Sequence, residues 1–139
     1  MPYWRLHYHF IWTTKGRENL ITADMEPRLY GMIGRKAKEL GATVHAIGGT
    51  EWHIHLLVSL PPTLTVSTFI GQIKGASSYF VNHVLQPNIL FRWQTEYGVV
   101  TVDDETLGRV VRYVLGQKEH HAKKTLWQRF EQTGQSSLS

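Results

Sequence analysis

Hydrophobic and polar residues alternate along four stretches of the chain, which predicts four β-strands. Because successive side chains on a strand point to opposite faces, each stretch should bury one face and leave the other for different contacts. The predicted strands span residues 3–14, 42–47, 52–59 and 97–102. The apolar face comprises Trp4, Leu6, Tyr8, Phe10 and Trp12 on the first strand, and Trp52, Ile54, Leu56 and Val58 on the third.

Three other stretches carry apolar residues at the spacing of an amphipathic helix. The first runs from about Met25 to Leu40, and the second from about Thr65 to His83. The third follows a pair of aspartates at 103–104, either of which can cap it. Its predicted inward stripe contains Leu107, Val110, Val111, Val114 and Lys118, while Tyr113, Gln117 and His120 lie along an adjacent face.

The predicted order is strand, helix, strand, strand, helix, strand, followed by one more helix. This is the split βαβ pattern of a ferredoxin-like α+β fold, in which an antiparallel sheet carries two helices on one face. The other face is free for a ligand or for the added C-terminal helix, which carries Tyr113. We expect residues 1–125 to form one domain and residues 126–139 to form a C-terminal tail.

The composition narrows the possible chemistry. The chain has 139 residues, of which 42% are hydrophobic, and it lacks cysteine, which removes disulfides, thiolate zinc sites and cysteine nucleophiles. A metal would therefore need histidine, carboxylate or amide ligands. The formal charge of +4 and the pI near 9.5 favour polyanionic partners. Because there is no long apolar run and no signal-like N-terminus, we expect a cytoplasmic protein that does not enter a membrane.

Two histidine pairs share the spacing His-x-His on predicted strands. His53 and His55 lie side by side on one face of a strand that a turn precedes and a double proline ends, so we interpret them as ligands of a divalent metal. The alternative is a pair of structural histidines without a metal. His7 and His9 have the same spacing, and we expect them to lie near the sheet surface or to support neighbouring groups.

Tyr113 and Gln117 lie one turn apart on the third predicted helix. A tyrosine beside an apolar stripe is usually a packing residue, and a glutamine on a helix is usually solvated. Together, however, an amide oxygen can reach a metal while the phenol one turn away reaches the substrate of that metal. The spacing alone leaves both interpretations open.

Several blocks, taken in order, resemble the single-tyrosine HUH transposases of the insertion-sequence-200-like family, which includes the REP-associated tyrosine transposases. The HUH motif is a histidine, a bulky hydrophobic residue and a histidine, and His53-Ile54-His55 matches it. A block containing Tyr97-Gly98 and a final block containing Tyr113 and Gln117 are also similar to family segments. The resemblance spans most of the predicted domain.

The resemblance implies a metal-dependent DNA transposase that cleaves and rejoins single-stranded DNA through a 5′-phosphotyrosine intermediate. At the matching positions, Tyr113 would be the nucleophile, and His53, His55 and Gln117 would bind Mg²⁺ or Mn²⁺. The family further implies recognition of DNA hairpins and a homodimer, in which the tyrosine helix serves either its own site or that of the partner.

Phosphate contacts are expected from basic side chains. The candidates are Lys15, Arg17, Lys74 and Arg112. Two other functions stay open: a domesticated regulator that binds hairpins or repeats without mobilising DNA, and a metal-binding ferredoxin-like domain unrelated to DNA. The intact tyrosine, glutamine and histidine pair favour catalysis over the first, and the multi-block resemblance counts against the second.

Overall fold

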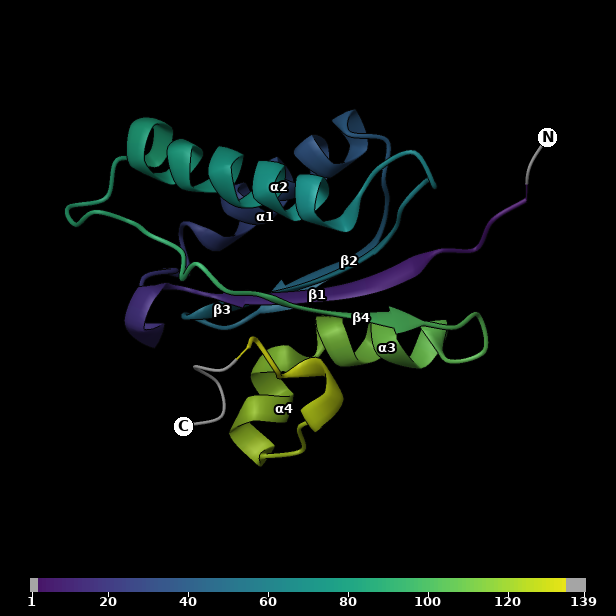
Figure 1. Ribbon diagram of the computed structural model, residues 1–139. Coiled ribbons are helices and arrows are strands. Elements are labelled where there is room, and N and C mark those ends of the chain that lie inside the picture. Colours follow the sequence, from purple (N-terminus) through teal and green to yellow (C-terminus); the bar gives the residue numbers. More distant parts are fainter. Residues whose placement is uncertain (1–2, 135–139) are drawn as a thin grey trace.

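The sheet has four antiparallel strands. The computed structural model describes residues 3–134, and its strands are β1 (His7–Thr13), β2 (Thr43–Gly49), β3 (His53–Ser59) and β4 (Gly98–Val102). Their order is β2-β3-β1-β4, so β1 and β3, which carry the two His-x-His pairs, are neighbours at the centre (Figure 1). This order confirms the predicted ferredoxin-like α+β fold.

Two helices cover one face of the sheet. α1 (Glu26–Glu39) and α2 (Val66–Phe80) lie side by side there (Figure 1). The Thr65 side chain caps α2 by accepting a hydrogen bond from a backbone N–H, and the helix continues into one π-helical turn, η2 (Val81–Leu85). The core beneath these helices includes Phe10, Trp12, Leu29, Ile33, Ile54, Leu56, Val58, Phe69, Ile70 and Ile73.

The opposite face of the sheet carries the tyrosine helix. The single helix expected there is wrong, because the structure divides it into α3 (Leu107–Leu115) and α4 (Gln117–Lys123) (Figure 1). The break lies at Gly116, whose φ of −97° and ψ of 21° are not helical, and glycine is a weak helix former. Lys118 is consequently not on an inward stripe; it is exposed and pairs with Glu26 at 2.5 Å.

A glycine brings α3 into direct contact with the sheet. A Cβ atom at Gly48 of β2 would lie only 1.8 Å from the backbone oxygen of Val114. The two backbones can approach this closely because glycine has no side chain. Tyr113 and Val114 are buried in a second apolar cluster with Ala46 and Leu57. The position of α3 is therefore set by its packing on β2 and β3.

The segment after α4 folds back onto the same face. Its short 3-10 helix, η3 (Gln128–Phe130), buries the Phe130 side chain in the cluster beneath α3. The Gln132 backbone oxygen approaches β4 so closely that a Cβ atom at Gly98 would lie 1.7 Å from it. Residues 126–134 therefore pack against the sheet, and the rest of the expected tail, residues 135–139, lies outside the described residues.

All four strands begin later than predicted, β2 and β4 by a single residue. β1 begins at His7 rather than Tyr3, and β3 begins at His53 because Trp52 lies in a bend. Trp52 is therefore absent from the apolar face on which it was expected; instead its ring lies 4.2 Å from that of His53. Between residues 3 and 134, no helix has both the length and the apolar character needed to cross a membrane.

Candidate metal centre and tyrosine site

The two histidines of β3 lie on one buried face, as the alternation predicted. The His53 and His55 side chains are fully buried, and their ring centroids are 4.9 Å apart. In the ladder between β1 and β3, these residues stand opposite Thr13 and Ile11. Their face of the sheet is the one that α3, α4 and the C-terminal segment cover, so both imidazoles are held in an enclosed environment.

Each of these histidines has a hydrogen-bond partner at Nδ1. The Nδ1 atom of His53 lies 2.7 Å from Thr50 Oγ1, and the Nδ1 atom of His55 lies 2.7 Å from His9 Nε2. When both Nδ1 atoms carry the proton and donate it to these partners, both Nε2 atoms present lone pairs to the site. A metal-binding histidine is typically oriented by such a hydrogen bond from its other ring nitrogen.

The histidine pair of β1 serves two different neighbours. His9 is buried and contacts His55, as described above. His7 is also buried, with Nδ1 2.6 Å from Ser59 Oγ and Nε2 2.5 Å from Asp104 Oδ1. The expectation that this pair supports neighbouring groups is confirmed, whereas neither member lies at the sheet surface.

Gln117 reaches His53 from the first residue of α4. Its Oε1 atom lies 3.2 Å from His53 Nε2, and its Nε2 atom donates to the Tyr113 backbone oxygen at 3.1 Å, which fixes the orientation of the amide. In the tautomer with His53 protonated at Nδ1, two lone pairs face each other. A cation between the two atoms would satisfy both.

Two further donors were missed by the sequence interpretation. The donor atoms of His53, His55, His121 and Glu131 lie within 4.8 Å of one another. His121 follows Gln117 by four residues, and this spacing on one helical face was a usable signal. Glu131 belongs to the segment predicted as a tail, and no local pattern connected it with the histidines.

Burial keeps the histidines neutral. It lowers the pKa of His53 to about 3, and it holds the pKa values of His9 and His55 well below the usual value. Burial also raises the pKa of Glu131. The contact of 3.4 Å between His55 Nε2 and Glu131 Oε2 is therefore not an ion pair between two charged groups.

The donor atoms fit a divalent metal. The Nε2 atoms of His55 and His121 are buried without a hydrogen-bond partner, which is costly unless another group satisfies them. Neutral imidazoles, an amide oxygen and a carboxylate are ligands that divalent transition metals accept, and the oxygen donors also suit Mg²⁺. This cluster could therefore hold a metal ion.

Tyr113 lies beside the histidines with its hydroxyl covered. The hydroxyl donates a hydrogen bond to Glu131 Oε2 and accepts one from the Trp127 N–H at 3.0 Å. The Tyr113 ring stacks on the Trp127 ring at 5.2 Å, and burial raises the pKa of the phenol above its ordinary value. The phenol is therefore protonated, with a carboxylate in place to accept its proton.

The structure brings Lys15 and Lys74 to one pocket, which Arg92 also lines and whose volume is about 570 Å³. Lys74 Nζ donates to the backbone oxygens of residues 94, 95 and 96 at 2.6, 3.1 and 3.3 Å. Burial lowers the pKa of this ammonium group. The contacts of Lys74 hold the segment before β4 in place, whereas the Lys15 and Arg92 side chains are exposed.

The other two expected phosphate ligands are separated. The Arg17 guanidinium lies 5.2 Å from the centroid of the Trp52 ring, which in turn contacts His53. Arg112 is exposed on α3, on the opposite side of the sheet from α2 and Lys74 (Figure 1). The structure therefore places Arg17 next to the histidine cluster and leaves Arg112 apart from Lys74.

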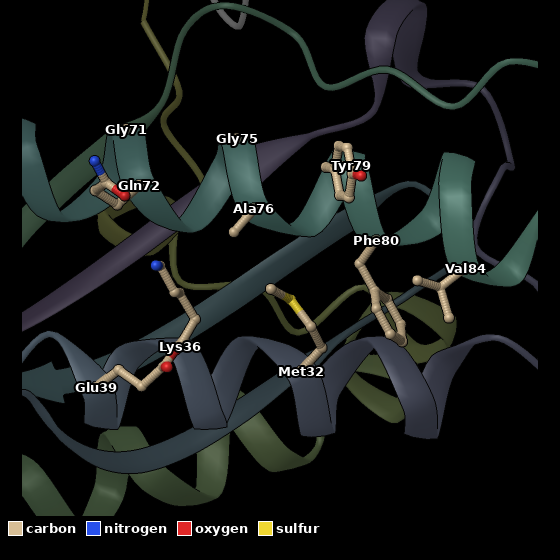
Figure 2. Close-up of a pocket in the computed structure, with 10 residues that line it drawn as sticks. All are labelled: Met32, Lys36, Glu39, Gly71, Gln72, Gly75, Ala76, Tyr79, Phe80 and Val84. Atoms are coloured by element: carbon tan, nitrogen blue, oxygen red, sulfur yellow. The ribbon is translucent and has the colours of Figure 1, made fainter.

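A second pocket of about 570 Å³ lies between α1 and α2. Figure 2 shows small residues of α2, including Gly75 and Ala76, facing Met32 and Lys36 of α1. α1 and α2, which line this groove, lie on the other side of the sheet from α3 and α4 (Figure 1). It contributes no group to the histidine cluster.

A ferredoxin-like sheet that holds an HUH histidine pair, a helix glutamine and a tyrosine on the face opposite α1 and α2 defines a protein of the tyrosine transposase class. The comparison with protein families agrees: the model of the family described as "Transposase IS200 like" matches residues 2–117. The chain belongs to this family.

Individual relatives give the same result. The chain is 26% identical over 121 residues to the ISDra2 transposase TnpA of Deinococcus radiodurans, which covers 84% of this chain and 86% of the relative. It is 33% identical over 76 residues to the transposase for insertion sequence element IS200 of Salmonella typhimurium, over 54% of this chain and 49% of the relative.

Two solved structures share the fold. A candidate transposase from Deinococcus radiodurans superposes with a TM-score of 0.65 at 24% identity, covering 82% of this chain and 92% of the other. A REP-associated tyrosine transposase bound to a REP hairpin superposes with a TM-score of 0.62 at 16% identity, covering 91% and 76%. At these identities the likeness establishes the shared fold.

Proposed function

We propose that this chain is a metal-dependent DNA transposase that cleaves and rejoins single-stranded DNA through a 5′-phosphotyrosine intermediate on Tyr113. One observation carries the proposal: the Tyr113 hydroxyl, the Glu131 carboxylate and the donor atoms of the two HUH histidines converge in one buried cluster. Membership of the IS200-like transposase family supports the same reaction class.

In the proposed step, the Tyr113 oxygen attacks the scissile phosphorus. A bond forms between that oxygen and phosphorus, the bond to the 3′ oxygen breaks, and the departing oxygen takes up a proton to become a 3′-hydroxyl. A phenol with the ordinary pKa of about 10 needs about 4 kcal/mol to lose its proton at pH 7, and the raised pKa of the buried Tyr113 adds to this cost. Glu131 accepts that proton, because its carboxylate already receives the Tyr113 hydrogen bond. Attack by a different 3′-hydroxyl reverses the step and joins new strands.

His53, His55 and Gln117 hold Mg²⁺ or Mn²⁺ in this proposal, and His121 is close enough to add a ligand. When bound, the ion neutralises charge on the scissile phosphate. The hydrogen bonds that orient these three side chains are present without an ion: Thr50 and His9 hold the two imidazoles, and the Tyr113 backbone holds the amide.

DNA reaches the centre along the edge that carries Arg17 and Trp52. Arg17 supplies a phosphate contact, Trp52 an aromatic face for an unpaired base, and Lys15 and Arg92 continue the basic surface into the adjoining pocket. We propose that the chain recognises DNA hairpins, as does the REP-associated neighbour bound to one. A homodimer also stays a prediction, although the contact between Tyr113 and His55 within one chain supports cleavage by the chain's own tyrosine.

The test is to incubate the protein with single-stranded DNA that carries a hairpin, with Mg²⁺, with Mn²⁺ or with a chelator. The expected product is a covalent protein–DNA adduct that forms only with a metal and survives denaturation. Tyr113→Phe should abolish the adduct while hairpin binding persists. Tyr79→Phe is the matched control, because Tyr79 is an exposed tyrosine of α2 that stacks on His83 away from the cluster. An adduct that persists in Tyr113→Phe would falsify the assignment.

The second candidate function is a hairpin-binding or repeat-binding regulator without mobilising activity. The observation that favours it is the covered hydroxyl: Tyr113 is 2% exposed, beneath Trp127 and the rest of the C-terminal segment. For such a regulator, hairpin binding would be retained without any adduct at any metal concentration. The same incubation therefore distinguishes the two functions.

A further inference from the structure

The histidine of β1 that contacts the HUH pair is not one of the proposed metal ligands. His9 is 1% exposed and its Nε2 atom lies 2.7 Å from His55 Nδ1. In the ladder, His9 stands opposite Leu57, so it is the diagonal neighbour of His55 on the same face of the adjacent strand. The contact is thus set by strand register, between two rigid central strands.

One proton is shared by these two ring nitrogens, and its position decides what His55 can bind. When His55 Nδ1 carries the proton, it donates a hydrogen bond to His9 Nε2, and His55 Nε2 presents a lone pair to the cluster. When His9 Nε2 carries the proton, it donates a hydrogen bond to His55 Nδ1. The proton of the neutral His55 ring is then on Nε2, which faces Glu131 Oε2 at 3.4 Å. Only the first arrangement leaves His55 able to hold a metal.

We infer that His9 is a positioning residue that selects the metal-binding tautomer of His55 by accepting a hydrogen bond from its Nδ1–H group. The inference rests on the proposed function, because it concerns the same centre. His9 reaches neither the metal nor DNA in this arrangement; it acts through His55. Thr50, which contacts His53 Nδ1 through a hydroxyl, is the corresponding partner of the other HUH histidine.

The surroundings of His9 direct its side-chain hydrogen bond to His55. Its other nitrogen, Nδ1, is buried without a hydrogen-bond partner, and the Phe130 ring lies 4.6 Å from its own. Among the described residues, no other side chain is hydrogen-bonded to His9, so its one side-chain hydrogen bond joins it to His55. His7, two residues earlier on the same strand, instead contacts Ser59 and Asp104.

The experiment compares substitutions at His9 with the same substitutions at His7. In His9→Phe the acceptor is lost, and we expect the Mn²⁺ affinity to fall about 10- to 100-fold, the usual effect of removing such an outer partner. His9→Gln places an amide oxygen near the position of Nε2, and we expect it to restore most of the affinity. His7→Phe and His7→Gln should bind Mn²⁺ as the wild type does. Calorimetric titration of the metal-free proteins measures each affinity, and the thermal midpoint reports whether each variant is folded.

A second readout needs no substitution. The ¹⁵N shifts of the imidazoles in Mg²⁺-loaded wild-type protein should place a proton on His55 Nδ1 and none on His9 Nε2. A proton on His9 Nε2, or a folded His9→Phe variant with wild-type affinity, would overturn the inference and leave the metal centre standing. If wild-type protein binds no metal, or binds it equally well as His55→Ala, the proposed centre itself is wrong and the inference falls with it.

Discussion

Replacing Gly48 by alanine should move the tyrosine helix without changing any group at the site. The added Cβ atom would lie 1.8 Å from the Val114 backbone oxygen, whereas ordinary contacts of this kind begin near 3.4 Å. The obstacle is backbone on both sides, so no side chain can rotate away. α3 must therefore withdraw from β2 by about 1.6 Å, the difference between these two distances.

This displacement carries Tyr113 away from its neighbours, because Val114 is the next residue on α3. A misplacement of about 1 Å can lower the rate of an enzymatic step by about 100-fold. We expect adduct formation by Gly48→Ala to slow by at least that factor, and the free energy of unfolding to fall by about 1–3 kcal/mol from overpacking. Single-turnover adduct formation, followed on denaturing gels at saturating protein, measures the rate independently of DNA affinity.

The control is Gly71→Ala on α2. A Cβ atom at Gly71 meets nothing within 4 Å, and alanine within a helix is favoured over glycine by about 0.5–1 kcal/mol. This variant should cleave at the wild-type rate and melt at the same temperature or higher. A Gly48→Ala variant that is folded by circular dichroism and yet forms the adduct as fast as Gly71→Ala would show that the close approach at Gly48 does not set the position of Tyr113.

Three further predictions follow from the site and its surroundings. Glu131→Gln removes the acceptor of the Tyr113 proton and should slow adduct formation by about 100-fold or more at unchanged hairpin affinity. Adduct formation at the wild-type rate or faster would mean that Glu131 only covers the tyrosine. Lys74→Met should lower the free energy of unfolding by about 1–3 kcal/mol in urea titrations without changing how strongly DNA binding depends on salt. Lys15→Ala should reduce the slope of log affinity against log salt concentration by about one, the contribution of one phosphate contact. In metal-free protein, stability should fall as the pH decreases from about 6.5 toward 3, because the unfolded state binds a proton at His53 that the folded state excludes; each buried histidine contributes up to about 1.4 kcal/mol per pH unit. A flat stability profile across that pH window in chelator would contradict the last of these.

The sequence was informative where a single element determines the outcome. Alternation along β3 placed His53 and His55 on one face, and helical spacing placed Gln117 one turn from Tyr113; both relations depend only on local geometry. The strand and helix order was sufficient for the ferredoxin-like topology, because few arrangements connect these elements without crossings.

The features of the site that the sequence did not predict depend mostly on contacts between distant parts of the chain. Glu131 enters the cluster because the C-terminal segment packs over Gly98, a close approach that no local pattern encodes. Lys74, which was expected to contact a phosphate, instead donates to three backbone oxygens of another segment through its ammonium group. The helix break at Gly116 was the exception, since a glycine within a predicted helix was a visible warning.

The stacking of two tryptophans on the site means that the protein carries its own fluorescent reporters. Trp127 stacks on the Tyr113 ring, in the segment that covers the hydroxyl, whereas the Trp52 ring contacts the rings of His53 and His121. Subtracting the emission of Trp127→Phe from that of the wild type would isolate the signal of the ring that stacks on Tyr113. The corresponding difference for Trp52→Phe would isolate events at the histidine edge. Rapid mixing could then time events at the histidines and at the tyrosine as separate signals, without any attached dye.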